Sequence, residues 1–313
     1  MPLRPCQPNN INREIFMQPL THVNFAGSPK RNARDLSTSP WLESVQDRHT
    51  GSRLGGIFMT SDPRQNHLLA ALPENEFTRI APHLEPIAFT HADILYRSGE
   101  KLKDIYFPTT ATASLLCAMD DGTSVEVAVV GNEGTLGASI FPGDNTALTQ
   151  ATILNTGSGY RLSAKWLKHE FDHVGALQRV LMRHTQTLIA QMAQTSGCIR
   201  RHSVEQQLCR WLLLNLDRAP SGSLAMTQEL MAGMLGVRRE SITEAAGKLQ
   251  MARLISYSRG HIEVLDRPGL ETQACECYDV VKKEFARLRS DLIAIWPGSN
   301  AGAHETSPHY ASA

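Results

Sequence analysis

The side chains best suited to bind another molecule are concentrated in one stretch of the sequence, between Thr227 and Arg259. Arg238, Arg239 and Glu240 follow one another there. An arginine can donate two parallel hydrogen bonds to guanine, and a glutamate can accept one from the amino group of cytosine. These residue types therefore predict recognition of base edges, provided that one helix presents them together. The candidate contacts are Thr227, Gln228, Arg238, Arg239, Glu240, Ser241, Thr243, Glu244, Lys248 and Arg259.

The surrounding sequence predicts two short helices joined by a tight turn. Thr227 can cap the first helix through its hydroxyl, and Gly236 can end it in the left-handed conformation. A second helix is predicted from about Arg239 to Gln250, because apolar residues recur there at helical spacing. The predicted buried stripe is Ile242, Ala245, Ala246 and Leu249, and the predicted outer face is Glu240, Thr243, Glu244, Gly247 and Lys248. This pattern predicts a helix-turn-helix, whose second helix can enter a DNA major groove; an ordinary pair of packed helices is the alternative.

The sequence directly after this pair predicts a hairpin. Residues 254–265 alternate apolar and polar side chains around Arg259 and Gly260. A helix-turn-helix followed by a basic-tipped hairpin predicts a winged helix. The chain has no net charge, yet residues 237–261 hold five basic and two acidic residues, a net charge of +3. This local excess favours a surface that faces phosphates.

Several segments of this region resemble the DNA-binding domain of the Crp/Fnr family of bacterial transcription regulators. They are residues 227–229 (Thr-Gln-Glu), 235–241 (Leu-Gly-Val-Arg-Arg-Glu-Ser) and 260–264 (Gly-His-Ile-Glu-Val), within a match that spans about residues 200–270. Residues 236–239, 245–250 and 274–278 (Ala-Cys-Glu-Cys-Tyr) resemble one large branch of that family. The resemblance implies a homodimer that reads a palindromic operator through Arg239–Gln250. It also implies RNA polymerase as a partner.

The region ahead of the winged helix predicts short β-strands. Apolar and β-branched runs occupy residues 87–90, 94–96, 105–107, 113–117 and 125–130, and Asp121-Gly122 is a strong hairpin turn. Strands at this spacing predict a sandwich or a roll. In this position they resemble the cyclic-nucleotide-binding β-roll of the same family. The predicted fold class is α+β, with an N-terminal antiparallel β-roll, a long dimerisation helix and a C-terminal winged helix-turn-helix.

A long amphipathic helix is predicted between these two parts, from about Val174 to Gln194. Alternating three- and four-residue steps place one stripe of side chains on a single face, which favours pairing with a second helix. The resemblance implies that two subunits meet there, whereas a core helix that packs on its own β-roll is the alternative. A further helix is predicted over residues 203–216. The predicted dimer contacts are Leu177, Leu181, His184, Leu188 and Gln191.

A glycine-rich loop, residues 130–137, follows the strand predicted over residues 125–130. In nucleotide-binding members of the family the matching loop uses a glutamate after the glycine, and an arginine further along the chain. This chain has Thr135 in the glutamate position, and residues 144–150 contain no basic residue. A cyclic phosphate without a cationic partner loses charge-assisted hydrogen bonds, so we predict that the chain does not bind cyclic AMP. The sequence does not exclude a different small effector. Its candidate pocket is Gly134, Thr135, Leu136, Gly137, Thr146 and Ala147.

Composition argues against several other protein classes. A β-roll enzyme of the cupin type would carry a histidine-rich metal site on its strands, but residues 92–168 contain no histidine. We therefore predict that the chain is not an enzyme. No apolar run approaches the roughly 18 residues of a membrane-spanning helix, and no signal sequence begins the chain, so a cytoplasmic location is expected.

The six cysteines are scattered without a disulfide framework, which favours reduced thiols. Cys275 and Cys277 are close in sequence, but on a helix their side chains would diverge, and no further ligands can be placed beside them. The N-terminal region offers only Cys6, whereas an iron–sulfur cluster needs about four cysteines. We therefore predict an inert pair, no metal site and no cofactor.

The predicted domains are a disordered leader (1–63), the β-roll (64–170), the dimerisation helix (171–198), the winged helix (199–270) and a C-terminal helix with a disordered tail (271–313). The leader holds seven of the 16 prolines, and a start of translation at Met59 is left open. The predicted function is DNA-binding transcription regulation. Expected partners are double-stranded DNA, a second copy of the chain, RNA polymerase and an unidentified small effector, with no membrane. The alternative is a ligand-sensing roll whose C-terminal domain contacts protein.

Overall fold

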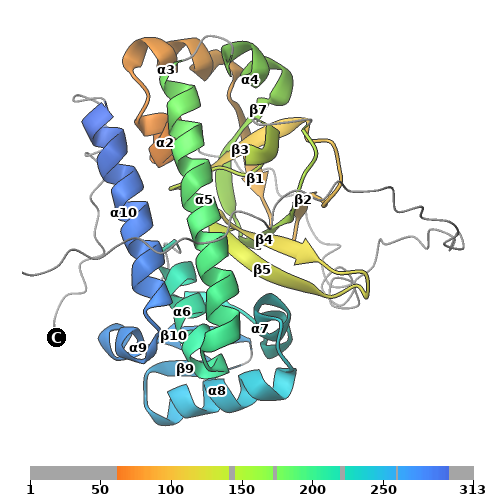
Figure 1. The fold of residues 1–313 in the computed structure, drawn as a ribbon, viewed down its shortest axis with the longest axis vertical. Coiled ribbons are helices and arrows are strands. Elements are labelled where there is room, and N and C mark those ends of the chain that lie inside the picture. The colour runs from red at the N-terminus through yellow and green to blue at the C-terminus, as the bar shows by residue number, and fades with distance from the viewer. Residues whose placement is uncertain (1–61, 141–144, 172–174, 219–222, 259, 296–313) are drawn as a thin grey trace, which may run out of the picture. The chain divides into compact units, whose positions relative to one another are not determined.

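The computed structural model describes residues 62–140, 145–171, 175–218, 223–258 and 260–295 (Figure 1). The predictions for the leader up to residue 61, for Met59, for Arg259 and for the tail beyond residue 295 fall outside these ranges. The described residues belong to one unit of mutual contacts. None of their helices has both the length and the apolar character to cross a membrane.

The described chain begins with short helices and continues with the strands of the roll, a long helix and the C-terminal helices with their short strands. The roll, the long helix and the C-terminal part follow one another in the predicted order. Its strands are β1 (Glu85–Phe89), β2 (Ile94–Tyr96), β3 (Asp104–Pro108), β4 (Thr112–Ala118), β5 (Ser124–Val130), β6 (Gln150–Asn155), β7 (Gly157–Ser163), β8 (Ser223–Ala225), β9 (Ile255–Ser258) and β10 (His261–Val264). Its α-helices are α2 (His67–Ala70), α3 (Glu74–Ile80), α4 (Ala164–Phe171), α5 (Ala176–Arg201), α6 (Val204–Leu216), α7 (Gln228–Leu235), α8 (Arg239–Met251), α9 (Arg267–Gln273) and α10 (Cys277–Ile295).

Two antiparallel sheets form the β-roll, with strand orders β2-β6-β4-β5 and β1-β7-β3. The five strand segments singled out in the sequence are confirmed to within about two residues, whereas β6 and β7 carried no individual prediction. Gly122 has a φ of +85° at the β4–β5 turn, and the Asp121 carboxylate accepts the Thr123 N–H there. The predicted α+β fold class is therefore confirmed, because the sheets are antiparallel and the seven strands of the roll precede the helices α5 and α6.

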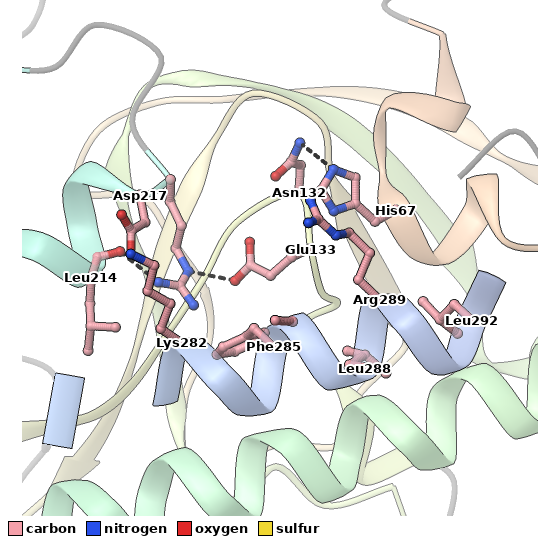
Figure 2. A pocket seen from close by; sticks show the side chains of 12 residues that line it. His67, Asn132, Glu133, Leu214, Asp217, Lys282, Phe285, Leu288, Arg289 and Leu292 are labelled. Carbon is pink, nitrogen blue, oxygen red and sulfur yellow. Dashed lines mark hydrogen bonds and ion pairs between the residues drawn. The ribbon is translucent and has the colours of Figure 1, made fainter. Parts of the chain in front are cut away.

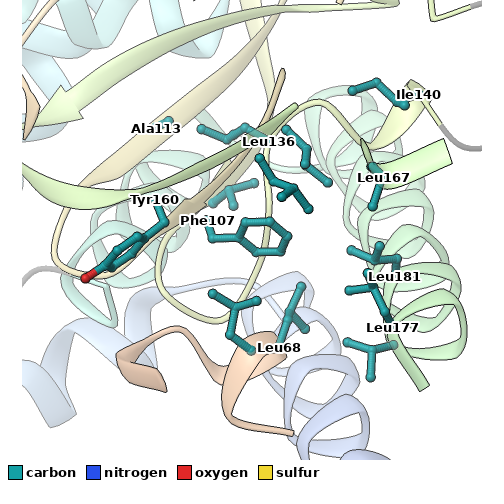
Figure 3. Close-up of a cluster of buried hydrophobic side chains, with 14 of the residues drawn as sticks. Leu68, Phe107, Ala113, Leu136, Ile140, Tyr160, Leu167, Leu177 and Leu181 are labelled. Carbon is teal, nitrogen blue, oxygen red and sulfur yellow. The ribbon is translucent and has the colours of Figure 1, made fainter. Parts of the chain in front are cut away.

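The core of the roll includes residues from the long helix α5 (Figure 3). Leu177 and Leu181 of α5 point toward Phe107 and Leu68, and their exposed fractions are 5% and 0%. His184, Leu188 and Gln191 are buried as well. The prediction that these five residues meet a partner subunit is therefore wrong. They pack inside their own chain, because the seam that they form is the apolar stripe that covers the roll.

The opposite face of α5 stays exposed in the single chain. Met182 and Ile189 lie seven residues apart on it, with exposed fractions of 60% and 61%. Ala193 and Ser196 continue the same stripe at steps of four and three residues. Helix α10 lies beside α5 along another side, and an Arg183–Asp291 ion pair joins the two helices (Figure 1).

The C-terminal part is a winged helix, as predicted. It contains helices α6, α7 and α8 and a three-stranded antiparallel sheet with the order β8-β10-β9, in which β8 lies between α6 and α7 in the chain and the β9–β10 hairpin follows α8. Ser203 and Gln206 form a capping box that starts α6, since the Ser203 hydroxyl accepts the Gln206 N–H and the Gln206 side chain accepts the Ser203 N–H. Strand β8 carried no prediction.

The roll and the winged helix share a second core. Leu116 and Val129 of the roll pack with Trp211 and other side chains of the winged helix in one buried cluster. The Trp211 Nε1–H donates to the Glu126 carboxylate at 2.9 Å across this contact. Residues from β4, β5 and α6 therefore join the two parts.

Candidate nucleic-acid interface

The helix-turn-helix is built as the sequence predicts. The Thr227 hydroxyl accepts the Leu230 N–H at 3.1 Å and caps α7. Gly236 ends α7 with a φ of +64°, the left-handed conformation that glycine adopts without strain. A β-carbon at this position would also lie 2.8 Å from Val125 Cγ2 of the roll. Two independent constraints therefore require glycine at this turn.

Helix α8 divides into the two predicted faces. It begins at Arg239, with Arg238 as its N-cap, and ends at Met251. The predicted stripe is confirmed, because Ile242, Ala245, Ala246 and Leu249 are all buried. The outer side chains are half-buried at Ser241 and Gly247 and exposed at Arg238, Arg239, Glu240, Thr243, Glu244 and Lys248.

The first turn of α8 leaves its charged groups accessible. The Arg239 side chain is 63% exposed, and its Nε lies 3.9 Å from the Glu229 carboxylate of α7. This distance is at the outer limit of an ion pair, so Arg239 can exchange Glu229 for a base at small cost. The Thr243 hydroxyl donates to the Gln228 side chain at 2.8 Å and thereby ties α8 to the start of α7.

Lys248 lies two turns further on and is held by acidic neighbours. Its Nζ is 2.9 Å from the Glu244 carboxylate and 3.8 Å from that of Glu205 in α6. The hydrogen bond with Glu244 raises the pKa of Lys248 above its ordinary value. Glu244 therefore competes with any phosphate that Lys248 contacts, and the sequence did not reveal this competition.

The wing is the hairpin of β9 and β10, whose register pairs His261 with Ser258. In the turn between these strands, Gly260 has a φ of +81°. Its carbonyl accepts the Met226 N–H at 2.7 Å, next to the N-cap residue of α7. The wing thus lies beside the start of the helix-turn-helix. Arg259, the predicted contact at its tip, is outside the described residues.

The glycine-rich loop after β5 is filled by the protein itself. Gly134, Thr135, Leu136 and Gly137 are all buried. The Thr135 N–H donates to His184 Nε2 of α5 at 3.1 Å, and a β-carbon at Gly134 would lie 2.4 Å from the His184 ring if nothing moved. Burial lowers the pKa of His184 to about 4, so the ring is neutral at pH 7. The expected effector pocket is therefore occupied at this end by an uncharged side chain of α5.

The rest of the expected pocket lies on the edge of the roll. Ala147 is buried, and Thr146 accepts a hydrogen bond from the Lys101 ammonium at 2.9 Å. Lys101, a basic side chain from a neighbouring segment, thus reaches Thr146, and it was not predicted.

A cavity of about 490 Å³ lies elsewhere, between the glycine-rich loop, the end of α6 and α10 (Figure 2). Glu133 of the loop faces Phe285 and Lys282 of α10 across it. The Arg218 Nε is 2.5 Å from the Glu133 carboxylate in its wall. Burial alone would raise the pKa of Glu133, but the Arg218 charge lowers it below its ordinary value. None of the six expected pocket residues lines this cavity.

The expectation that Cys275 and Cys277 diverge on a helix is also wrong. Helix α10 begins at Cys277, so Cys275 lies in the loop before it. Both thiols lie with Cys198 of α5, and the three cysteines form one buried cluster. No local sequence signal pairs residues that are 77 positions apart, as Cys198 and Cys275 are.

Comparisons with known proteins agree with this architecture. Residues 206–273 match the family of Crp-like helix-turn-helix domains. FixK2 from Bradyrhizobium japonicum has a similar structure, with 16% identity and a TM-score of 0.52, over 61% of this chain and 98% of FixK2. A regulator of the crp/fnr family from Eubacterium rectale also has a similar structure, with 17% identity and a TM-score of 0.54. The match covers 67% of this chain and 98% of that regulator.

A third solved structure, a transcriptional regulator of the CRP family from Thermus thermophilus, shares 18% identity with a TM-score of 0.50, over 60% of this chain and 96% of that chain. No curated protein matches the chain by sequence. At these identities the solved structures show the fold, and the helix-turn-helix match adds the domain family. Residues 206–273 are thus a Crp-like helix-turn-helix domain, set in a chain whose fold is similar to that of these solved regulators.

Proposed function

We propose that the chain acts as a homodimer that binds a palindromic DNA site through α8 and regulates transcription there. The observation that carries this proposal is the first turn of α8, where Arg238, Arg239 and Glu240 are exposed on one accessible end. In helix-turn-helix docking the N-terminal residues of the second helix reach the base edges. Arg239 then reads guanine, Glu240 contacts cytosine, and Lys248 and Arg259 contact phosphate.

The proposed dimer uses the face of α5 that the single chain leaves exposed. Met182, Ile189, Ala193 and Ser196 follow steps of seven, four and three residues, the period of a two-helix seam. A partner helix along this face would remove the apolar surface of Met182 and Ile189 from water, which favours the seam. A two-fold axis along this seam would present two copies of α8 to successive major grooves, roughly 34 Å apart.

The test compares two variants of α8. Arg239→Ala is expected to weaken binding to the preferred site by about 1–3 kcal/mol and to relax the preference at one base pair of each half-site. Lys248→Ala is expected to weaken all DNA sequences alike and to make the salt dependence of binding less steep. Gel shifts on the preferred site and on random DNA at several salt concentrations separate the two effects.

Equal losses on specific and random DNA for Arg239→Ala would assign Arg239 to the backbone instead of a base. A protein that retards no genomic DNA fragment would favour the second candidate, a ligand-sensing roll whose winged helix contacts protein. RNA polymerase is the expected protein partner in the first case, and we propose no catalytic activity in either.

The same proposal excludes cyclic AMP as the effector. His184 packs against the Thr135 backbone with a neutral ring, so a cyclic phosphate at this loop would meet no cation from α5. Isothermal calorimetry should show no specific binding of cyclic AMP, and DNA binding should be unchanged when it is added. A dissociation constant in the micromolar range would contradict this assignment and would point to Lys101, which already reaches Thr146.

A further inference from the structure

Four metal-ligating side chains converge where α5 ends and α10 begins. They come from Cys198 in the last turn of α5, His202 just after it, Cys275 in the loop before α10, and Cys277 at the start of α10. We call these residues the Cys3His cluster. One ligand atom from each of them lies within 4.8 Å of all the others.

The local structure explains this convergence. Cys198 and His202 are four residues apart, so the last turn of α5 places both on one side of the helix end. Cys275 lies in the short loop after α9, Cys277 begins α10, and helix α10 packs along α5. The pairing of these two helices therefore brings the two halves of the cluster together.

The distances fit one tetrahedral metal ion. Zinc bonds of about 2.3 Å to sulfur and about 2.0 Å to nitrogen separate two sulfurs by about 3.8 Å, and sulfur from nitrogen by about 3.5 Å. The Cys198 and Cys275 sulfurs are 3.5 Å apart, and the Cys277 sulfur lies 3.5 Å from His202 Nδ1. Small movements of the side chains would complete the coordination.

The groups around the cluster have the arrangement that metal ligands require. The second nitrogen of His202, Nε2, lies 3.2 Å from the Glu276 carboxylate, which fixes the ring with Nδ1 facing the sulfurs. The Gln194 amide donates to the Cys277 sulfur at 3.0 Å. Arg210 is buried and acts electrostatically on Cys198. Three thiolates and one zinc ion carry a net charge of −1, which the Arg210 guanidinium offsets.

We propose that this chain holds one zinc ion in a closed structural site formed by the Cys3His cluster. Zinc is the metal that such a set selects, because three thiolates and one imidazole in tetrahedral geometry leave no open position for a substrate. Iron–sulfur clusters take mainly cysteine ligands and hold several metal atoms, so they need ligands farther apart than these. A Cys198–Cys275 disulfide would not account for Cys277 and His202, whose ligand atoms lie within 4.8 Å of both sulfurs.

The site has a structural consequence for the winged helix. Its ligands come from both ends of the segment that contains α6 to α9, so the ion closes this segment into a loop. It also fixes the end of α5 relative to the start of α10. Bound zinc therefore stabilises the folded chain, because the unfolded chain does not hold the four ligands together. This inference stands independently of DNA binding.

Elemental analysis and X-ray absorption of the purified full chain test the site directly. We expect one zinc ion per chain, with three sulfur neighbours and one nitrogen neighbour. Cys198→Ser, Cys275→Ser and His202→Ala should lose the ion, whereas His202→Cys should keep it with four sulfur neighbours. Cys117→Ser and Cys209→Ser are matched controls, because these thiols lie outside the cluster, and both should keep the ion.

Three further measurements do not depend on whether the ligand variants fold. Cobalt titrated into the metal-depleted wild-type chain should produce the absorption bands of a tetrahedral thiolate site. Glu276→Gln, which alters an exposed side chain, should weaken zinc affinity by about 10–100-fold in competition with a chelator. Removal of zinc should lower the midpoint of thermal unfolding.

Several results would overturn the proposal. They are the absence of metal together with no cobalt bands, iron with acid-labile sulfide in place of zinc, and a Cys198–Cys275 disulfide in the chain purified under reducing conditions. Zinc retained by Cys275→Ser and His202→Ala would place the ion elsewhere. An unchanged unfolding midpoint after zinc removal would contradict the structural role.

Discussion

At the scale of single residues, the least expected group is the carboxyl of Glu126. It is buried between the roll and α6, where it accepts hydrogen bonds from Ser114 and Trp211. Burial raises its pKa from 4.5 to about 7, although these hydrogen bonds and the charges of Arg210 and Arg218 act in the opposite direction. Glu126 is thus a group whose charge changes near neutral pH at the contact between the two parts.

This shift predicts a pH dependence of stability. The folded chain keeps the Glu126 proton up to about pH 7, whereas the unfolded chain releases it near pH 4.5. The stability contribution of the protonated group is therefore complete below pH 4.5 and is lost as the pH rises to about 7, with a slope of about 1.4 kcal/mol per pH unit. Glu126→Gln should remove this slope in urea unfolding followed at several pH values.

The exposed Glu263 in β10 provides the control for that experiment. Glu263→Gln should follow the wild-type pH profile, because its carboxylate is solvated in both states. If Glu126→Gln also follows the wild-type profile between pH 4.5 and 7, folding does not raise the pKa of the Glu126 carboxyl.

At the scale of elements, α5 shows how one helix serves two surfaces. Its Leu177–Leu181–Leu188 side fills the core of the roll, so only the side with Met182 and Ile189 is free for a second subunit. A heptad pattern cannot by itself say which stripe faces the chain's own core, because both stripes recur with nearly the same period. The structure assigns them by burial.

The exposed stripe predicts the effect of a charge on assembly. Ile189→Asp should weaken the proposed dimer by more than about tenfold, since an unpaired carboxylate would be buried at its centre. Leu265→Asp is the matched control, because Leu265 is exposed to a similar extent, 56% against 61%, but lies after the wing. Sedimentation velocity over a range of concentrations measures both. A dimer unaffected by Ile189→Asp would place the interface on another surface.

At the scale of the whole molecule, the Arg218–Glu133 ion pair joins the loop after β5 to the chain after α6. Its side chains are only 5% and 16% exposed, so removing one partner leaves a charge without compensation. Arg218→Ala should lower the free energy of unfolding by about 3–5 kcal/mol, and a second substitution, Glu133→Gln, should recover part of the loss. Urea unfolding of the two variants measures this coupling.

The exposed Arg161–Glu85 pair, at 2.7 Å, has a similar distance but a different environment, with side chains 45% and 66% exposed. Arg161→Ala should cost no more than about 1 kcal/mol, because water already screens the pair. Equal losses in the free energy of unfolding for Arg218→Ala and Arg161→Ala would show that burial does not strengthen the Arg218–Glu133 pair.

The sequence by itself determined the features that depend on near neighbours. Thr227, Gly236 and the apolar period of residues 242–249 specify the helix-turn-helix, because caps, turns and helix faces depend on residues at most a few positions apart. Alternation and turn residues likewise specify the strands of the roll and the wing.

Only the tertiary structure decided which of these surfaces meet. It placed His184 in the glycine-rich loop, turned the predicted seam of α5 inward, and brought Cys198 and His202 to Cys275 and Cys277. These contacts join residues separated by tens of positions, and no local pattern encodes such a pairing. The physical reason is that α5 packs on the roll and on α10 by burial of apolar faces, and this packing sets which polar groups come within bonding distance.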